Sequence, residues 1–584
     1  MVSRGMLRDD KLLLAMRLAQ ILAELGENQL DELFAVTQSQ KDVDISAAEL
    51  GPFETLVWSK SNKADSVIQY AETWVSSILG KNVIREAEFH LKDVIEEESL
   101  PHVPILLCSL PGYDASGQVV NIADKGKSLK SLSMGSDSGF AMAEKYVMTA
   151  AQKGSWVLLR NIHLCPKFIV RLEKQLHSLR PAPTFRLFLT AEVNPNIPQS
   201  LILLSQTFVF EPPAGIKASL TRSLMAVPES RMNQAPAERG RVYFLLMWFH
   251  ALVLERLQYV PIGWSKSYEF SSSDQNCSLR SIDEWIERVA NGRMHVAPEE
   301  IPWDALRAIL GQSFYGGRVD NKFDQALLDS FLNDLFSPKS FDKNFSLCEG
   351  IIAPEGTKHK DFMTWVEELP NNNSPTWMGL SASAENVILE HKGKSVLKKL
   401  FMIQDAAAIV GTSAGKEDGD DNEGQNSASD KNKTLNSTIF QNALMKSRQA
   451  MAKSKSISLD SLTLTIDFER KSTDGTTDVE FCVQGLYLEG AEVEGNILKL
   501  SDQGKWNLSI TTFSWREKEA SDVDAADNSA SIKKNELLIP FYFDAGRHEL
   551  IASVPVKYDI SGSVTAQQYL QRGVAMVVGD DCKL

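Results

Sequence analysis

The stretch PILLCSLPGYDASGQV, residues 104–119, has the layout of a phosphate-binding loop without its chemical residues. Its apolar start predicts a buried strand. The strand leads into Gly112 and Gly117, which stand at the G-x-x-x-x-G spacing with which backbone N–H groups surround a phosphate. Gln118 and Val119 then replace the Lys and the Ser or Thr of a working loop, so a charge for the outer phosphates and a hydroxyl for Mg²⁺ are missing. A simple turn after a strand would explain the two glycines equally well.

Two further apolar runs continue the pattern. Residues 156–159, in GSWVLLRNIHL, predict a buried parallel strand. In a P-loop ATPase this strand ends in an acidic pair, in which one carboxylate holds Mg²⁺ and the other activates water. Arg160 and Asn161 occupy those places. A third run at 185–189 follows a helix predicted at 165–178, so the sequence predicts a P-loop-type α/β module with no catalytic residue and no cofactor or metal site.

Several long motifs in residues 101–345 resemble the sixth AAA+ module of a dynein heavy chain, the cytoplasmic type more than the axonemal. They include LCSLPGYDASG, GSWVLLRNIHL, FVFEPPAGIKASLTRSL and ILGQSFYGGRVDNKFDQ. In that family the sixth module does not bind nucleotide, and ATP and Mg²⁺ are held by upstream modules. This implication agrees with the residues found here at the phosphate loop and at the end of the second strand.

The resemblance also implies a parent protein, a microtubule minus-end-directed motor located in the cytoplasm on microtubules. Its partners would be the other AAA+ modules of the heavy chain. Through the parent they would also be the dynein intermediate, light intermediate and light chains and microtubules. The segment itself would be a non-catalytic, ring-closing and regulatory part. A free-standing adaptor derived from a dynein heavy chain and an atypical AAA+ ATPase are the alternatives.

Composition limits other functions. The formal charge of −15 and the pI near 5.3 argue against a nucleic-acid-binding protein, and no run of eighteen apolar residues predicts a membrane span. The six cysteines lie far apart without the spacing of a zinc site. We interpret His163 and Cys165, two positions apart, as packing groups rather than metal ligands.

The predicted order of parts is α/β, then α, then β. Residues 7–25 predict an amphipathic helix whose apolar face is Leu14, Leu18, Ile21 and Leu25. The predicted domains are a helical region at 1–100, the degenerate AAA+ module at 101–213, a helical lid at 214–345, a helical start of the C-terminal domain at 346–410, a disordered acidic linker at 411–437 and a C-terminal helix with a β domain at 438–584.

In the lid, residues 239–258 are apolar on most sides, which predicts a buried core helix rather than an aromatic-lined ligand pocket. Gly316 and Gly317 permit a sharp turn, and we expect Arg318 to pair with a carboxylate. After a helix at 440–454, alternating apolar residues predict a small antiparallel β barrel or sandwich. Its strands are expected at 462–468, 481–483, 496–500, 506–515, 536–543, 548–556 and 573–578.

Overall fold

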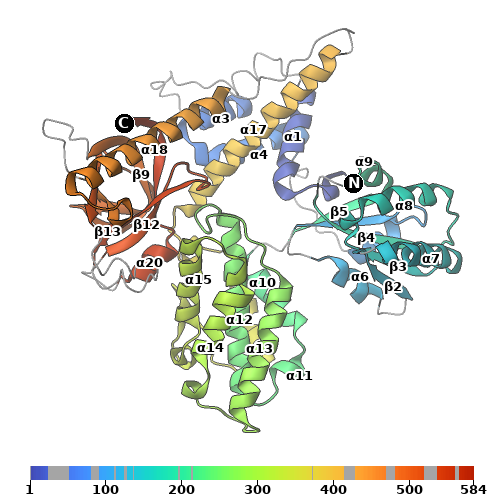
Figure 1. Ribbon diagram of the computed structural model, residues 1–584. Coiled ribbons are helices and arrows are strands. Elements are labelled where there is room, and N and C mark those ends of the chain that lie inside the picture. Colours follow the sequence, from blue (N-terminus) through green and yellow to red (C-terminus); the bar gives the residue numbers. More distant parts are fainter. Residues whose placement is uncertain are drawn as a thin grey trace. The chain divides into compact units, whose positions relative to one another are not determined.

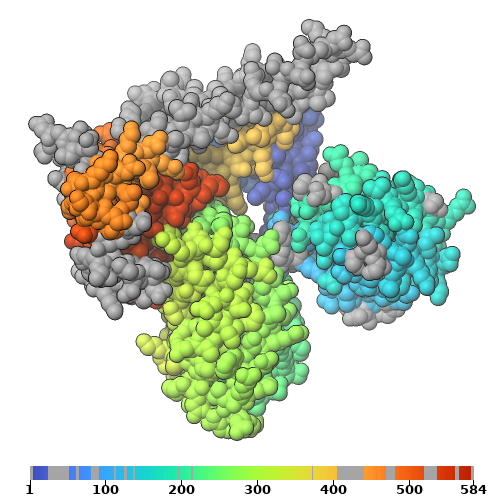
Figure 2. Space-filling view, viewed as in Figure 1, coloured from blue at the N-terminus to red at the C-terminus, as the bar shows by residue number. Residues whose placement is uncertain are grey.

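The computed structural model divides the chain into two compact units, Met1–Pro213 with Leu389–Gly415 and Ala214–Ile388 with Lys416–Leu584. Figure 1 shows the elements of each unit, and Figure 2 gives the space-filling view coloured along the sequence. Between residues 404 and 439 only the backbone of two helices is described. The described residues are 2–23, 51–80, 91–110, 114–123, 128–135, 137–194, 197–211, 215–370, 373–413, 428–468, 480–517, 536–559 and 564–583.

The first unit contains a five-stranded sheet in the order β2-β3-β4-β1-β5, and every pairing in it is parallel. The runs predicted near 105, 156 and 185 are confirmed as strands β1, β3 and β4. The sequence did not predict β2, which lies in the chain between the first and second predicted strands. The bounds are β1 (Ile105–Ser109), β2 (Leu129–Ser133), β3 (Trp156–Arg160), β4 (Arg186–Glu192) and β5 (Gln206–Phe210).

Helices cover both faces of this sheet (Figure 1). Successive side chains of a strand point to opposite faces. On β3, Val157 and Leu159 therefore pack with α7 (Asp137–Lys153) and α8 (Pro166–Ser178), while Leu158 packs with the opposite layer. That opposite layer includes α6 (Ser116–Ala123) and residues 91–95, of α5 (Leu91–Asp93) and the turn after it. A short helix, α9 (Gln199–Leu204), precedes β5.

Helices before the sheet form a separate core with part of α17. Helix α1 packs through Leu13, Met16 and Ala19, whereas Leu18 and Ile21 are exposed. The predicted apolar face was therefore wrong, because the buried side of the helix carries Leu13, Met16 and Ala19 instead. Leu25 lies outside the described residues. The helices are α1 (Arg8–Leu22), α3 (Pro52–Asn62), α4 (Val67–Leu79) and α17 (Ala384–Ser413).

The second unit begins with a helical bundle around α12 (Glu238–Arg256). Nearly every side chain of α12 is buried, which confirms the prediction of a core helix. Arg318 pairs with Asp274 at 3.0 Å, as expected. A two-stranded hairpin of β6 (Ser346–Cys348) and β7 (Ile351–Ile352) stands where the sequence predicted only short helices. The surrounding helices are α10 (Ile216–Ala226), α11 (Glu229–Met232), α13 (Ser272–Ala290), α14 (Trp303–Ile309), α15 (Lys322–Leu335) and α16 (His359–Glu368).

The predicted linker at 411–437 is bordered by helices that enter it from both sides. Helix α17 ends at Ser413, and α18 (Ala428–Lys455) begins well before the predicted start at 440. Both ends of the predicted linker are therefore helical, and residues 414–427 lie outside the described residues. No helix in the described part of the protein is long and apolar enough to cross a membrane.

The last part of the second unit is a seven-stranded sheet in the order β10-β13-β12-β14-β9-β11-β8, with a further pairing of β10 to β9. The expectation of a wholly antiparallel sheet is wrong, because β10–β13 and β12–β14 are parallel. The strand predicted at 506–515 is divided between two strands. The elements are β8 (Leu462–Asp467), β9 (Phe481–Glu494), β10 (Ile497–Asn507), β11 (Thr511–Glu517), β12 (Glu536–Tyr542), β13 (Leu550–Tyr558), α20 (Ala566–Gln571) and β14 (Ala575–Lys583).

Candidate functional site: a degenerate phosphate loop

The predicted phosphate loop lies at the carboxyl edge of the parallel sheet. Strand β1 ends at Ser109, which is in register with Glu192 at the end of β4, and α6 begins after the loop at Ser116. A strand, a loop and then a helix N-terminus is the arrangement that receives phosphate in P-loop proteins. Gly112 lies outside the described residues. The structure therefore positions the second half of the motif.

The three described motif residues lie in the first turns of α6. Val119 is fully buried and packs under the sheet, so an apolar side chain occupies the position of the Mg²⁺-binding hydroxyl. Gln118, in the position of the lysine, is half-buried. A Cβ added to Gly117 would meet no atom within 4 Å, so packing does not require glycine there. Both chemical positions hold neutral side chains.

A salt bridge spans the site. The Arg160 guanidinium at the end of β3 donates to Asp114 Oδ2 in the loop at 2.7 Å. The Asp114 carboxylate also accepts from the backbone N–H of Ser116 at 2.9 Å and from its hydroxyl at 2.6 Å. Burial raises the pKa of Asp114, but the Ser116 hydrogen bonds and the Arg160 charge outweigh burial, so its pKa lies below the usual value.

Asn161 has a backbone role. Its φ of 59° and ψ of 45° place it in the left-handed region, which asparagine tolerates better than most residues. Its backbone N–H donates to Thr190 Oγ1 at 3.2 Å, which joins the end of β3 to β4. Neither residue that follows the apolar part of β3 is acidic. The places of the metal-holding and water-activating carboxylates are therefore taken by a cation and an amide.

His163 and Cys165 act as local packing groups, as predicted. The Nδ1 atom of buried His163 accepts from the backbone N–H of Glu192 at 3.1 Å, and the Cys165 thiol donates to the Met134 carbonyl at 3.6 Å. Among the described residues, no group of His, Cys, Asp and Glu side chains is arranged to hold a metal ion.

Sequence reasoning did not find Asp114. Its partner Arg160 is 46 residues away, and only the parallel sheet brings the end of β3 to the loop after β1. An acidic residue inside the loop, together with a basic residue in the acidic-pair position, was the signal that could have revealed the salt bridge.

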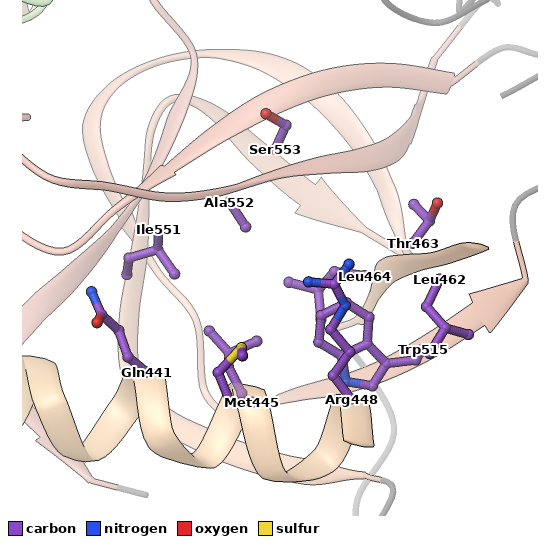
Figure 3. Close-up of a pocket in the computed structure, with 11 residues that line it drawn as sticks. Gln441, Met445, Arg448, Leu462, Thr463, Leu464, Trp515, Ile551, Ala552 and Ser553 are labelled. Carbon is purple, nitrogen blue, oxygen red and sulfur yellow. The ribbon is translucent and has the colours of Figure 1, made fainter. Parts of the chain in front are cut away.

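A hollow of about 420 Å³ lies in the C-terminal β region between α18 and the strands β8, β11 and β13 (Figure 3). Its walls are mainly apolar, from residues such as Leu444, Leu464 and Ile551. At one side the Arg448 guanidinium lies over the Trp515 ring at 5.4 Å and donates to the Leu459 carbonyl at 2.8 Å. Its described lining contains no pair of acid and base groups that could carry a reaction.

A parallel sheet with a glycine loop after β1, followed by a helical bundle, defines the P-loop AAA+ class of module and its lid. Comparison with family models makes the class specific. Residues 100–209 match the region D6 P-loop domain of the dynein heavy chain, 239–384 match its AAA lid domain, and 434–578 match its C-terminal domain. The protein belongs to the dynein heavy chain family and contains these three domains. The lid match extends past the border predicted at 345.

Individual dynein heavy chains are also similar in sequence to this protein. The protein is 43% identical to the cytoplasmic dynein heavy chain of Dictyostelium discoideum over 384 residues, which are 65% of this sequence and 8% of that protein. It is 44% identical to the cytoplasmic dynein heavy chain of Drosophila melanogaster over 355 residues, 59% of this sequence and 8% of that one. The similarity to cytoplasmic dynein 2 heavy chain 1 of Chlamydomonas reinhardtii is lower, at 31% over 351 residues, 59% of this sequence and 8% of that one. The protein therefore spans a small part of the length of these relatives.

Proposed function

We propose that this protein acts as the C-terminal, non-catalytic part of a cytoplasmic dynein heavy chain, a microtubule minus-end-directed motor, and that it neither binds nor hydrolyses nucleotide. Its role in the parent is to close the ring of AAA+ modules and to regulate it. The motor's ATP and Mg²⁺ belong to upstream modules. The contacts with microtubules and with the intermediate, light intermediate and light chains are made through the parent, in the cytoplasm.

One observation supports this proposal most strongly. Arg160 occupies the place of the carboxylate that holds Mg²⁺ and is paired with Asp114 of the phosphate loop. A nucleotide with its Mg²⁺ needs a cation beside the outer phosphates and a carboxylate beside the metal. Here the Arg160 guanidinium occupies the position of the metal-binding carboxylate, and its charge is already paired with Asp114. With Val119 buried at the hydroxyl position, the electrostatic contacts that dominate phosphoryl transfer are missing.

The surrounding scaffold supports a mechanical role. The strands that form the centre of the sheet are intact, and their side chains are almost completely buried on both faces. A module without a nucleotide cycle has no ligand whose different affinity for two states could shift it between them. Its movements must therefore be imposed by neighbouring modules, and its stiffness transmits them.

We further propose that the C-terminal strands form a small β barrel. The pairing of β10 with both β13 and β9 supports this proposal, because it returns the order β10-β13-β12-β14-β9 to its first strand. Closure removes exposed strand edges and therefore protects these strands from pairing with other proteins.

The proposal is tested in a complete dynein heavy chain that carries this segment. The triple change Gln118→Lys, Arg160→Asp and Asn161→Glu restores the missing charges and is expected to leave microtubule gliding speed and microtubule-stimulated ATPase close to the unsubstituted motor. Leu158→Asp is expected to cripple both, because Leu158 is fully buried in the central sheet and the new carboxylate has no partner.

Val170→Asp is the matched control for Leu158→Asp, because Val170 is 47% exposed on α8 of the same module. It introduces the same charge at the surface and should preserve motility. A motor whose speed and ATPase are unchanged by Leu158→Asp would show that the module is not a coupling element. A large gain of ATPase from the triple change would favour the atypical ATPase instead.

A further inference from the structure

The last residue of α12, Arg256, has a fully buried side chain that joins three separate segments of the second unit. Its Nε donates to the Gly263 carbonyl at 3.0 Å in the loop after α12. Its Nη1 donates to the Met378 carbonyl, shortly before α17, and to the Gln571 carbonyl at 3.1 Å, at the end of α20. Gln571 belongs to the C-terminal β domain, so the guanidinium reaches from the lid into that domain.

The positive charge of Arg256 is held without a salt bridge to any described carboxylate. The guanidinium lies over the Phe331 ring at 5.2 Å and the Trp264 ring at 5.9 Å, an arrangement in which aromatic faces stabilise a cation. Burial lowers the pKa of Arg256 to about 9, and the charge of Asp324 partly opposes this shift. The group therefore stays charged at neutral pH and depends on its three carbonyls, one of which the β domain supplies.

Side chains around Gln571 make further contacts at this junction between the lid and the β domain. Helices α15 and α20 lie side by side (Figure 1), and the Gln571 amide donates to Ser330 Oγ at 2.8 Å and to Asp334 Oδ2 at 2.7 Å on α15. A Cβ on Gly379, which has a φ of +75°, would lie 2.8 Å from the Gln571 Cβ. A Cβ on Gly573, with a φ of +67°, would lie 2.5 Å from the Ile262 carbonyl oxygen. Two glycines thus permit backbones to meet where the lid and the β domain join.

The β domain contributes a second arginine to the junction. Arg547 donates to the Gly573 carbonyl at 2.8 Å and to Glu489 Oε2 at 2.7 Å, and its charge acts on both Arg256 and Asp324 of the lid. Direct hydrogen bonds between the lid and the β domain are made by Arg256 and Gln571, so separating the two would leave polar groups on both sides without partners.

We propose that the lid carries a specific docking surface for the C-terminal β domain, with Arg256 as its clamp, and that this surface holds the domain without help from the connection through residues 414–427. The occupant is the protein's own domain of residues 440–583. Arg256 also donates to the Met378 carbonyl. The same side chain therefore holds both the β domain and the segment that leads into α17.

The test uses the full-length protein with a specific protease site placed within residues 414–427 and cut after folding. The two fragments of the unsubstituted protein should co-elute in gel filtration at low micromolar concentration. Their separation at this concentration would overturn the proposal, because the connection would then be what holds the domain.

Variants identify the clamp in the cut protein. Gln571→Glu places a carboxylate against Asp334 and should weaken the association at least about tenfold, measured as the dissociation constant by analytical ultracentrifugation. Gln484→Glu makes the same change at an exposed position of the same domain and should have no effect. Arg256→Met, which keeps an apolar stem, should release the fragment. If Arg256→Met does not fold, the test rests on Gln571→Glu. Fragments of a folded variant that associate as tightly as those of the unsubstituted protein would refute the clamp.

Discussion

Two ion pairs of this molecule have the same length and opposite surroundings. Arg160 and Asp114, at the degenerate phosphate loop, lie 2.7 Å apart with side chains 41% and 47% exposed. Arg547 and Glu489, in the C-terminal β domain, also lie 2.7 Å apart, but their side chains are only 5% and 2% exposed. The two pairs therefore do not differ in the distance between their charged atoms, but they differ in their exposure to solvent.

The difference shows how each region uses charge. At the phosphate loop, solvent screens the pair, so the residues there can change at little cost to the fold. In the β domain, each charge was taken out of water and depends on its partner. We infer that charge changes are tolerated at the phosphate loop, whereas they are costly at the buried pair of the β domain.

The largest effect is expected from Glu489→Gln, which leaves the buried Arg547 without its counter-charge. Removing one partner of a buried pair typically destabilises a domain by about 3–5 kcal/mol. The β domain should therefore unfold at clearly lower denaturant concentration, measured by near-ultraviolet circular dichroism and by proteolysis within residues 480–583.

Glu494→Gln is the matched control, because Glu494 lies on the same strand and pairs with Lys499 while 73% exposed. It should shift the transition hardly at all. Equal effects of the two substitutions would contradict the contrast between buried and exposed pairs. The double substitution Arg547→Met with Glu489→Leu should recover much of the loss, because no buried charge remains.

A much smaller effect is expected from Arg160→Ala at the phosphate loop. Exposed ion pairs contribute about 0–1 kcal/mol, so the unfolding transition of the α/β module should move only slightly. Thermal unfolding followed by tryptophan fluorescence provides the measurement, since Trp156 lies within the module's sheet. A loss comparable to that of Glu489→Gln would show that the pair has a structural role that its exposure does not suggest.

The smallest effect is a pH dependence carried by Asp114. Because its pKa is lower in the folded state than in the unfolded protein, the ionised carboxylate adds stability above about pH 4 and loses it as the pH falls through the folded pKa. The difference in stability between the unsubstituted protein and Asp114→Asn should therefore be small at pH 7 and should shrink further as the pH falls below about 4. A difference that grows on acidification would contradict the direction of this shift.

Much of the module could be predicted from sequence because its central strands are continuous apolar runs. Strand β2, with the sequence LKSLS, was missed because it is an edge strand with partly exposed side chains, so it shows no such run. The face of α1 was misplaced because Leu18 and Ile21 suggested an apolar stripe, whereas the buried side chains include Leu13, Met16 and Ala19.

The degenerate site was only partly predictable. The missing lysine, hydroxyl and acidic pair could be inferred from motif spacing. The Asp114–Arg160 salt bridge required the strand order. The Arg256 clamp gave no sequence signal, because its partners are main-chain carbonyls, which every residue possesses.

The most direct test of the central claim is equilibrium dialysis of the protein against Mg-ATP. We expect no saturable binding up to about millimolar nucleotide, a free energy of binding weaker than about −4 kcal/mol. The decisive control is Gly117→Val at the second glycine of the motif, where an added Cβ would meet no protein atom within 4 Å. Micromolar binding that Gly117→Val abolishes would contradict the account, because the loop would then still hold nucleotide.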